Sequence, residues 1–527
     1  MANDLKLTPE KIHQKLRERF DGDFKRLSDI PDPALLHDGL IAAKRIAHAI
    51  TNNQSITVVG DYDVDGVTST SIMIDFFKII NYPLKTIIPN RFTDGYGISK
   101  NIMQRVEADL VITVDNGINA IEAAQICRER NIDLIITDHH TPSDTLPQCF
   151  ALVNPKLKAC TYPFKEICGA QVAWLLLALV KKELNADVNM SSFLDLLCIA
   201  IIADVMPLTN INRVMVQKGL ELIPKSPRPS MMALCSYLNK ERMSAEDIGF
   251  QIAPRINSAG RMEDASYALA FLTASTEMEA FQALEKLDRL NTFRKDIEAS
   301  ATKEAFEQAN SDDKIIVVAQ ENWHEGVVGI VAARLVGRFE KPAIVLSNDN
   351  GIAKGSARSL GEVNLYDLLS QSSSHLLKFG GHKMAAGLAL DITQVDAFRK
   401  TINAHADKLK ASDFIPEDEI MGELESEQIN FDLLKILDQF EPFGEGNPRP
   451  KFLIKDTPVL YVKRFGENNA HLRFNVPHKN EPYGLGVVAF KNSTLLENNS
   501  KVSLSFTLNK NEYNGKVSIQ LMLDRFY

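Results

Sequence analysis

Four motifs rich in aspartate or histidine lie at or just past the ends of apolar runs, and they constrain the fold of this chain more than any other feature. They are Asp61-Tyr62-Asp63-Val64-Asp65-Gly66, Asp115-Asn116-Gly117, Asp138-His139-His140 and Ala203-Asp204. An apolar strand buried on both faces of a parallel sheet delivers its last residue to the carboxyl edge, where open α/β sheets hold their ligands. We therefore expect these acidic and imidazole side chains to meet at one sheet edge.

Such a gathering of carboxylates predicts a bound cation. Carboxylates held close together repel one another and resist ionisation unless a positive ion neutralises them. Oxygen ligands with one or two imidazoles suit Mn²⁺ or Mg²⁺ better than structural zinc, which favours cysteine sets. The six cysteines form no C-x-x-C pair, so we expect reduced thiols and neither a zinc site nor a disulfide framework.

Other interpretations of single motifs are weaker. The run from Asp61 to Gly66 resembles part of a calcium loop, but residue 72, where the last bidentate ligand would stand, is an isoleucine. Helix capping accounts for one of the three aspartates and hardly for all. Taken alone, Asp115 is more often a turn residue than a ligand. The metal-site prediction therefore depends on the convergence of the four motifs.

The first part of the chain alternates between short strand-like runs and helical spacing. Strands are expected at Ser55–Val59, Leu84–Ile88, Leu110–Val114 and Leu134–Thr137, with helices near 67–80, 98–107 and 118–130 between them and a helical region over 169–222. This order predicts a doubly wound parallel sheet.

In the rest of the chain, the spacing of apolar residues changes twice. Residues 276–310 hold no Gly or Pro and carry apolar residues at helical intervals, which predicts a long linker helix. A second, smaller α/β unit follows. The remainder alternates with period two, as in Val502–Leu508 and Val517–Leu521 around Asn514-Gly515, and this favours a hairpin within a small β-barrel. Periodicity alone does not separate an oligonucleotide-binding barrel from other β-domains.

We divide the chain accordingly into five parts. They are an N-terminal helical segment (1–50), a parallel-sheet domain (51–265), a linker helix (266–310), a second α/β domain (311–412) and a C-terminal β-barrel with its lead-in (413–527). A length of 527 residues is ample for several separate cores.

Composition narrows the class of protein. No apolar stretch approaches the roughly 18 residues of a membrane span, and the N-terminus lacks a basic region followed by an apolar one, so we expect a cytoplasmic protein without a membrane segment. The net charge of −9 argues against a surface coated in positive potential. It is compatible with a local groove of Arg and Lys that binds phosphates.

The motifs resemble those of the DHH phosphoesterase superfamily. The resemblance rests on Gly60–Gly66, Val114–Gly117, Asp138–His140 and Ile202–Leu208. Longer runs are similar to bacterial exonucleases specific for single-stranded DNA: Pro89–Gly97, Pro254–Arg261, His324–Ala332, Gly355–Ser359 and Gly380–Gly387. The resemblance covers most of the chain and implies that the C-terminal barrel is of the oligonucleotide-binding type.

The resemblance also implies roles for the motif residues. Asp65, Asp115, His139 and Asp204 would hold one ion, and Asp63 and Asp115 a second, with Asp115 bridging. His140 would contact the scissile phosphate or support the ligands. Many superfamily members carry a histidine where this chain has Val59, so we expect the second Mn²⁺ or Mg²⁺ to be held weakly or recruited with substrate.

A further group of residues matches family positions that contact DNA. Arg91, Arg255, Arg261 and Arg358 would bind phosphates, with Arg358, Ser356 and Arg91 forming a pocket for the 5′-terminal phosphate. Tyr96 would stack on a base. Gly381 and His382 would bring the backbone close to the substrate, although ordinary turn chemistry also explains these glycines.

The resemblance thus implies a metal-dependent exonuclease that degrades single-stranded DNA from the 5′ end and releases 5′-mononucleotides in DNA repair, including mismatch repair, and recombination. We expect a monomer whose protein partners include a single-strand-binding protein and a helicase. The alternatives are a phosphoesterase of nanoRNA, cyclic dinucleotides or pyrophosphate, and an inactive replication scaffold. The additional domains count against the first alternative, and the intact aspartates count against the second.

Overall fold

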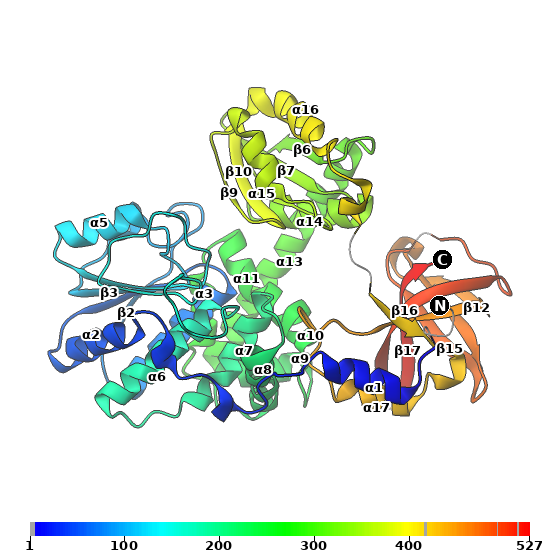
Figure 1. The fold of residues 1–527 in the computed structure, drawn as a ribbon, viewed down its shortest axis with the longest axis horizontal. Helices are drawn as coiled ribbons and strands as arrows, with labels where there is room; N and C mark the ends of the chain where they lie inside the picture. The colour runs from blue at the N-terminus through cyan, green and yellow to red at the C-terminus, as the bar shows by residue number, and fades with distance from the viewer. Residues whose placement is uncertain (1–5, 416–418, 493, 514–515) are drawn as a thin grey trace. The chain divides into compact units, whose positions relative to one another are not determined.

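The computed structural model of the chain describes residues 6–415, 419–492, 494–513 and 516–527. It consists of two compact units, which we call the large unit (Pro31–Asp204 and Gly219–Glu417) and the small unit (Met1–Ile30, Val205–Lys218 and Asp418–Tyr527). Figure 1 labels the helices and strands of both units.

The first sheet of the large unit is parallel throughout, with strand order β2-β1-β3-β4-β5. Its strands are β1 (Ile56–Val59), β2 (Lys85–Ile87), β3 (Leu110–Val114), β4 (Asp133–Thr137) and β5 (Ala151–Val153). Every residue of β1 and β3 is buried, as continuous apolar runs predict for central strands. The predicted parallel sheet is confirmed. Strand β5 was not predicted, because three residues are too few to show a periodicity.

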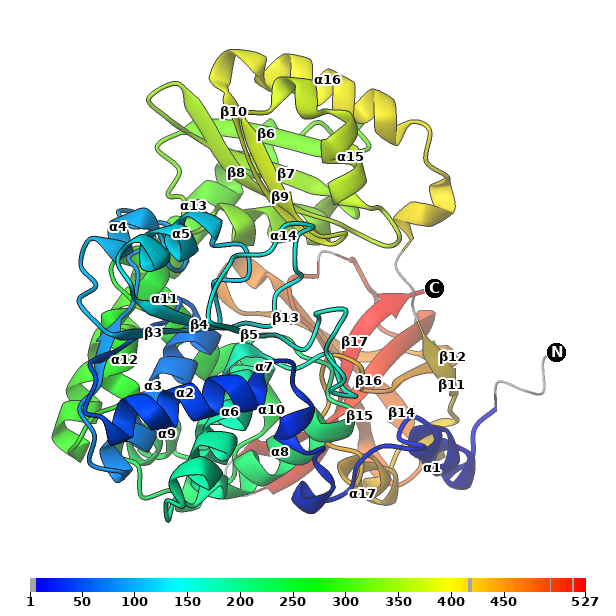
Figure 2. The same cartoon turned by 60° about the vertical axis from the view of Figure 1, so that its left-hand side comes forward.

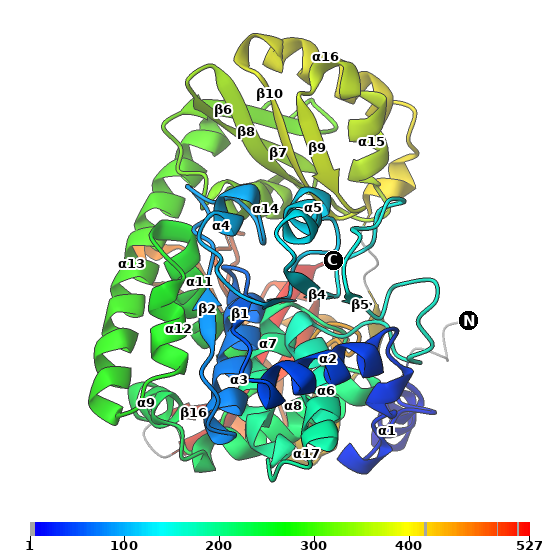
Figure 3. The ribbon, with the colours of Figure 1, turned by 90° about the vertical axis from the view of Figure 1, so that its left-hand side faces the viewer.

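Helices cover both faces of this sheet. Figure 3 shows α4 (Lys100–Met103) and α5 (Ile121–Glu129) on one face and α2 (Gly39–Thr51), α3 (Val64–Ile79) and α6 (Gly169–Leu184) on the other. Helix α3 begins earlier than predicted because the side chain of Asp63 caps its first turn. Helix α4 is shorter than predicted, because Ser99 caps its start and the chain must then extend to reach β3.

A mostly helical segment follows the parallel sheet. It contains α7 (Leu194–Ala203), α9 (Pro229–Leu238), α10 (Ala245–Asp247), a π-helical turn (Ile248–Ile252), α11 (Ala253–Met262) and α12 (Ser266–Leu272). The predicted long helix is confirmed as α13 (Glu277–Gln308), which is 32 residues long and capped by Thr276.

A second, mixed sheet follows α13 in the large unit, with strand order β6-β7-β8-β10-β9. Its strands are β6 (Ile316–Glu321), β7 (Ala343–Asp349), β8 (Ile352–Arg358), β9 (Lys378–Gly381) and β10 (Ala385–Asp391). Helices α15 (Leu365–Gln371) and α16 (Val395–Ala406) share a core with one face, and α14 (Val328–Phe339) packs against β7 and β8. Figure 2 shows this second α/β unit, which the sequence predicted.

The small unit is built on a seven-stranded sheet with order β11-β12-β16-β17-β15-β14-β13. The strands are β11 (Ile420–Glu423), β12 (Lys451–Pro458), β13 (Leu460–Phe465), β14 (His471–His478), β15 (Glu481–Ala489), β16 (Lys501–Tyr513) and β17 (Lys516–Phe526). Strands β12 and β14 are in contact although three strands separate them in the order, so the sheet curls into a barrel. The predicted turn at Asn514-Gly515 lies outside the described residues.

Helices and the N-terminal segment complete the small unit. Helix α17 (Phe431–Asp438) and α1 (Pro9–Glu18) pack together, and α8 (Asn210–Leu222) enters the unit through its first nine residues. Leu7, Ile12 and Leu16 belong to the same core as the buried faces of the barrel strands. Among the described residues, no helix has the length and apolarity needed to cross a membrane.

The burial of α1 generates a stability prediction. Leu16 is fully buried in the barrel core, so Leu16→Ala should lower the free energy of unfolding of the small unit by about 2–5 kcal/mol. Calorimetry of the full chain would record this as a lower transition temperature. The matched control is Arg17→Ala on the exposed face of the same helix. Equal transition temperatures for the two variants would contradict the assigned packing.

Candidate metal centre

The turn from β1 into α3 places the first carboxylates at the sheet edge. The backbone approaches itself so closely that a Cβ on Gly60 would lie 2.1 Å from Thr70 Oγ1, and a Cβ on Gly66 would lie 2.6 Å from the Asp61 backbone. Only glycine fits at both positions. The turn leaves Asp61 and Asp65 almost completely buried.

The start of α6 fixes the orientation of Asp65. Its Oδ2 accepts a hydrogen bond from Gly169 N at 2.5 Å, and its Oδ1 accepts one from Ala170 N at 2.9 Å. A Cβ on Gly169 would lie 2.5 Å from Asp115 Cβ, so this helix start also abuts the next aspartate. The positive end of α6 stabilises the Asp65 carboxylate and aims it at Asp115.

The ends of β3 and β4 carry the other two motifs. Asp115 follows β3 in the left-handed backbone region (φ 63°), and Asn116 Nδ2 donates to Val59 O, which ties the ends of β3 and β1 together. Asp138 directly follows β4 and accepts hydrogen bonds from the backbone of His139, His140 and Ile118. Asp138 therefore holds the two histidines in place.

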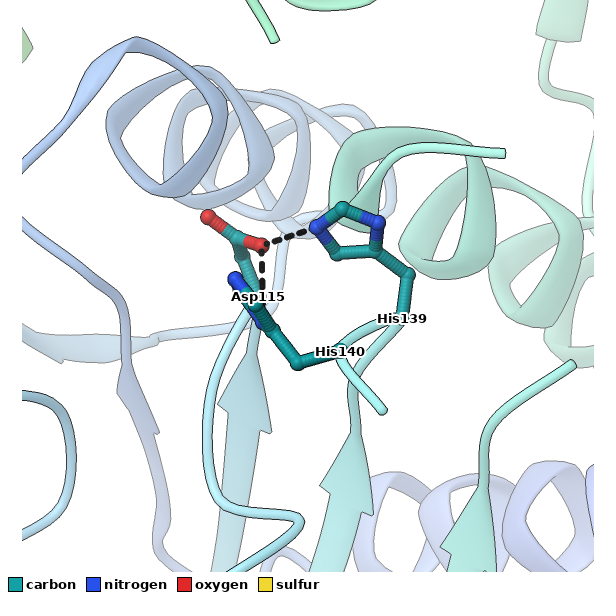
Figure 4. A group of neighbouring side chains, drawn as sticks. All are labelled: Asp115, His139 and His140. Carbon is teal, nitrogen blue, oxygen red and sulfur yellow. Dashed lines mark ion pairs between the residues drawn. The ribbon is translucent and has the colours of Figure 1, made fainter. Parts of the chain in front are cut away.

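Four side chains from separate elements surround one point. His139 Nε2 lies 3.2 Å from Asp115 Oδ1, 3.5 Å from Asp204 Oδ2 and 3.7 Å from Asp65 Oδ2. Figure 4 shows Oδ1 of Asp115 facing the rings of both His139 and His140. Asp204 reaches the point because it directly follows α7. These are the four residues that the sequence analysis expects to share an ion.

A second group adjoins the first through Asp115. Ligand atoms of Asp61, Asp63 and Asp115 all lie within 4.8 Å of one another. Val59 is a fully buried apolar strand residue, so its side chain contributes no ligand to this group. The structure places Asp61 in this group although it was not among the predicted ligands.

The electrostatics of the cluster require a cation. Burial, followed by the charge of Asp63, raises the pKa of Asp65 to about 6. Burial and neighbouring carboxylates also raise the pKa values of Asp61, Asp115 and Asp204 well above the ordinary range. Burial lowers the pKa of His139 to about 3, so its imidazole is neutral at pH 7. Without a cation, this cluster resists holding all its carboxylates ionised.

The donor atoms of the cluster fit a hard divalent cation. Oδ1 of Asp61, both carboxylate oxygens of Asp115, Oδ2 of Asp204 and Nε2 of His139 are buried and have no hydrogen-bond partner in the described part of the chain. Unpartnered buried oxygens are costly. Carboxylate oxygens with one neutral imidazole form a ligand set that Mn²⁺ and Mg²⁺ accept.

His140 lies at the edge of the cluster as a positive charge. Its Nδ1 is 2.7 Å from Asp138 Oδ1. Burial lowers the pKa of His140, but the hydrogen bond and charge of Asp138 outweigh it and raise the pKa to about 9. The Tyr96 ring packs edge-on against His140 at 6.0 Å between centroids. A cationic imidazole and an aromatic ring therefore flank the carboxylates.

The two ligand-bearing helices are tied together at their far ends. Asp75 lies near the end of α3, which carries Asp65 in its first turn, and Asp195 lies at the start of α7, which precedes Asp204. Arg228 pairs with both, with its Nε 3.2 Å from Asp195 Oδ2 and its Nη1 bonded to Asp75. This pairing fixes the register of α3 against α7 and hence the relative positions of Asp65 and Asp204.

A cavity of about 1430 Å³ adjoins His140 within the large unit. The predicted substrate residues that line it are Arg91, Tyr96, Arg261, Ser356, Arg358, Gly381 and His382. Arg255 is not among them: its Nε pairs with Asp288 at 2.8 Å and its guanidinium lies over the Tyr237 ring. The structure therefore brings together all the predicted substrate residues except Arg255, whose role stays a prediction.

Three guanidinium groups of this cavity lack a carboxylate partner. Arg91 donates to Gly260 O, Arg261 donates to Gly326 O and Arg358 donates to Ser356 Oγ, and none of the three forms an ion pair with a described residue. Burial, and then the charge of Arg91, lowers the pKa of Arg261 to about 10. Clustered cations without counter-ions form a site for an anion, and guanidinium forks suit phosphate.

Comparison with known proteins identifies the family. Residues 55–201 match the family model of the DHH family, N-terminal domain, residues 312–408 match the DHHA1 domain, and residues 420–525 match the RecJ OB domain. The single-stranded-DNA-specific exonuclease RecJ of Dickeya dadantii is 33% identical over 543 residues, which covers 95% of this chain and 92% of that protein. The chain belongs to the RecJ family.

Other RecJ proteins agree with this assignment. RecJ of Bacillus subtilis is 38% identical over 510 residues, which make up 94% of this chain and 64% of that longer protein. The crystal structure of RecJ in complex with Mn²⁺ from Thermus thermophilus matches with a TM-score of 0.81 at 31% identity, covering 93% of this chain and 72% of that one. A second structure of that RecJ contains Mg²⁺ and matches with a TM-score of 0.76 at 30% identity, covering 93% of this chain and 70% of that one.

Sequence reasoning on this RecJ-family chain missed three supporting residues. Asp61 stands in the same motif as Asp63 and Asp65, and the even spacing of the three aspartates was the available signal. Asp138 precedes both histidines, but its role depends on backbone hydrogen bonds. Arg228 gave no signal, because its partners lie 33 and 153 residues away.

The raised pKa of Asp65 generates a pH prediction. A carboxyl group whose pKa rises on folding favours the folded state when protonated, so this contribution is lost as pH rises from about 4 to about 6. The metal-free protein should therefore lose stability over this window. Mn²⁺ should raise the melting temperature more at about pH 7 than at about pH 4.5.

Calorimetry with chelator or Mn²⁺ at the two pH values measures the effect. Asp65→Asn should reduce the pH dependence of the metal-induced shift, whereas Asp144→Asn at an exposed position should leave it unchanged. A Mn²⁺ shift of equal size at both pH values in the unsubstituted protein would contradict the assignment of Asp65.

Proposed function

We propose that this RecJ-family protein is a metal-dependent exonuclease that degrades single-stranded DNA from its 5′ end and releases 5′-mononucleotides. The observation that carries the proposal is the convergence of Asp65, Asp115 and Asp204 on His139 Nε2. The cavity with three unpaired guanidinium groups beside this cluster supports a polyanionic substrate. Relatives named single-stranded-DNA-specific exonuclease RecJ support the choice of DNA.

Two groups of side chains would hold Mn²⁺ or Mg²⁺. Asp65, Asp115, His139 and Asp204 would hold the first ion, and Asp61, Asp63 and Asp115 would hold the second. When bound, the ions supply Lewis-acid activation of the attacking water and of the phosphodiester. The chain itself supplies a fixed ligand frame, because α6 orients Asp65 and Asp138 orients the histidines.

The remaining residues position the DNA strand. Arg358, Ser356 and Arg91 hold the 5′-terminal phosphate, so the next phosphate along the strand lies at the metal centre. Water attacks this phosphorus and the 3′-oxygen of the terminal nucleotide leaves, which yields a 5′-mononucleotide and a new 5′-phosphate on the shortened strand. His140 faces the reacting phosphate as a cation, and Tyr96, which is half exposed, offers a ring for a base.

Domain roles and cellular context belong to the same proposal. The three family matches fall within 51–265, 311–412 and 413–527, which supports these as the catalytic, substrate-binding and oligonucleotide-binding domains. We place the protein in the cytoplasm as a monomer that acts in DNA repair, including mismatch repair, and recombination, alongside a single-strand-binding protein and a helicase. The cavity exceeds the roughly 300–1,000 Å³ of ordinary small-ligand sites, which disfavours a nanoRNA, cyclic-dinucleotide or pyrophosphate substrate.

Asp115→Asn tests the metal centre. Asparagine tolerates the left-handed backbone of Asp115, so the variant should fold while losing about a hundredfold or more of its hydrolysis rate. The assay is digestion of 5′-labelled and 3′-labelled single strands and a matched duplex, with and without chelator. Labelled mononucleotide should appear first from the 5′-labelled strand and only with metal, and an active Asp115→Asn variant would overturn the assignment.

Arg358→Ala tests the terminal phosphate pocket. Loss of a charged hydrogen-bond donor should cost about 1.5–3 kcal/mol, roughly ten- to hundredfold in kcat/KM on 5′-phosphorylated strands. Activity on 5′-hydroxyl strands should change much less, and Arg358→Lys should restore part of the preference. A variant that loses equal activity on both kinds of end would exclude this pocket, and unchanged Mn²⁺ binding separates the effect from the metal centre.

A further inference from the structure

The cavity continues along β8 beyond the pocket for the terminal phosphate. Lys354, Ser356 and Arg358 alternate along this strand, and all three line the cavity. Residues two apart in a strand share a face and lie about 6.6 Å from each other. Lys354 therefore occupies the next position on the same face as Ser356 and Arg358.

Strand register places a second lysine in the same row. Across the sheet, Ser356 pairs with Gly387, which pairs with Gly380, so this row presents almost no side chains. In the next row of the same face, Lys354 pairs with Ala389, which pairs with Lys378. Both lysines and Ala389 line the cavity. The first row thus carries only small residues. The next row carries two lysines, one on each side of Ala389.

The row of lysines lies on the far side of Ser356 from Arg358. His382 N donates to Ala385 O, and Ala385 pairs with Arg358, so His382 lies beside Arg358 at one end of the sheet. His382, Arg358 and His140 line the same cavity. Lys354 and Lys378 are at the opposite end of the same face.

Both lysines are available to an anion. Lys354 Nζ pairs with Glu325 Oε1 at 3.0 Å, and both side chains remain more than a third exposed. An exposed ion pair contributes only about 0–1 kcal/mol, so an incoming phosphate can displace Glu325 at little cost. Lys378 is exposed and has no ion pair with any residue in the described ranges.

We propose that Lys354 and Lys378 form a second anion subsite that binds the outer phosphates of a 5′-polyphosphate end. The inference rests on the proposed function, because it takes Ser356 and Arg358 as the site of the first phosphate. Additional phosphates point away from the scissile bond and reach the lysine row. The hydrolysis is unchanged: water attacks the next phosphorus, the 3′-oxygen leaves, and the released nucleotide keeps its 5′-triphosphate.

The experiment compares one oligodeoxynucleotide with a 5′-monophosphate or a 5′-triphosphate. We expect the enzyme to cleave the triphosphorylated strand and to release a nucleoside triphosphate as its first product, identified by chromatography. The double variant Lys354→Ala/Lys378→Ala should lower the triphosphate-to-monophosphate ratio of kcat/KM about tenfold or more. Glu325→Gln should raise this ratio, because it removes the competing carboxylate.

Controls separate the possible failures. Lys400→Ala removes one positive charge from an exposed position on α16 and should leave the ratio unchanged, whereas each single variant, Lys354→Ala or Lys378→Ala, should lower it. Melting curves check that each variant folds. If the monophosphorylated strand is cleaved but the triphosphorylated strand is not, or if the double variant keeps the normal ratio, the subsite is excluded while the proposed function stands. If neither strand is cleaved, the proposed function itself fails.

Discussion

Repulsion among buried carboxylates is the constraint on which the rest of the structure depends. Asp61, Asp65 and Asp115 are each at most 2% exposed, and burial raises their pKa values. In a low-dielectric interior such groups cannot all be charged unless a cation lies between them. The surrounding structure holds them in place against this repulsion, through the backbone amides of α6 for Asp65 and through the left-handed turn for Asp115.

The charge of the cavity is opposite to that of the metal centre. Arg91, Arg261 and Arg358 donate to neutral oxygens and form no ion pair with a carboxylate in the described ranges. In the proposed function, a phosphodiester strand would pair with these guanidinium groups and its reacting phosphate would lie at the carboxylate cluster. The overall net charge of −9 is therefore compatible with binding of a polyanion, because three arginines gather locally in this cavity.

The positions of the candidate ligands also depend on ion pairs between helices that lie far from the carboxylate cluster. Arg228 joins α3 and α7 at the ends opposite to Asp65 and Asp204. A shift of one residue between two helices moves a side chain by about 1.5 Å, which is enough to spoil a metal site. The register of these helices thus sets the relative positions of the candidate ligands, although Arg228 does not line the cavity.

The sequence by itself determined the elements and the positions of the ligands within them. Apolar runs that end in Asp115 or Asp138 specify buried parallel strands with acidic ends, the absence of Gly and Pro specifies α13, and period two specifies the barrel strands, because each pattern is local. Only the tertiary structure decided that Asp61 is buried with the candidate ligands and that β5 joins the sheet. It also decided that Arg255 pairs with Asp288, whereas Arg91 forms no ion pair with a described residue. Burial and charge pairing depend on contacts between residues far apart in the chain, and no local pattern encodes them.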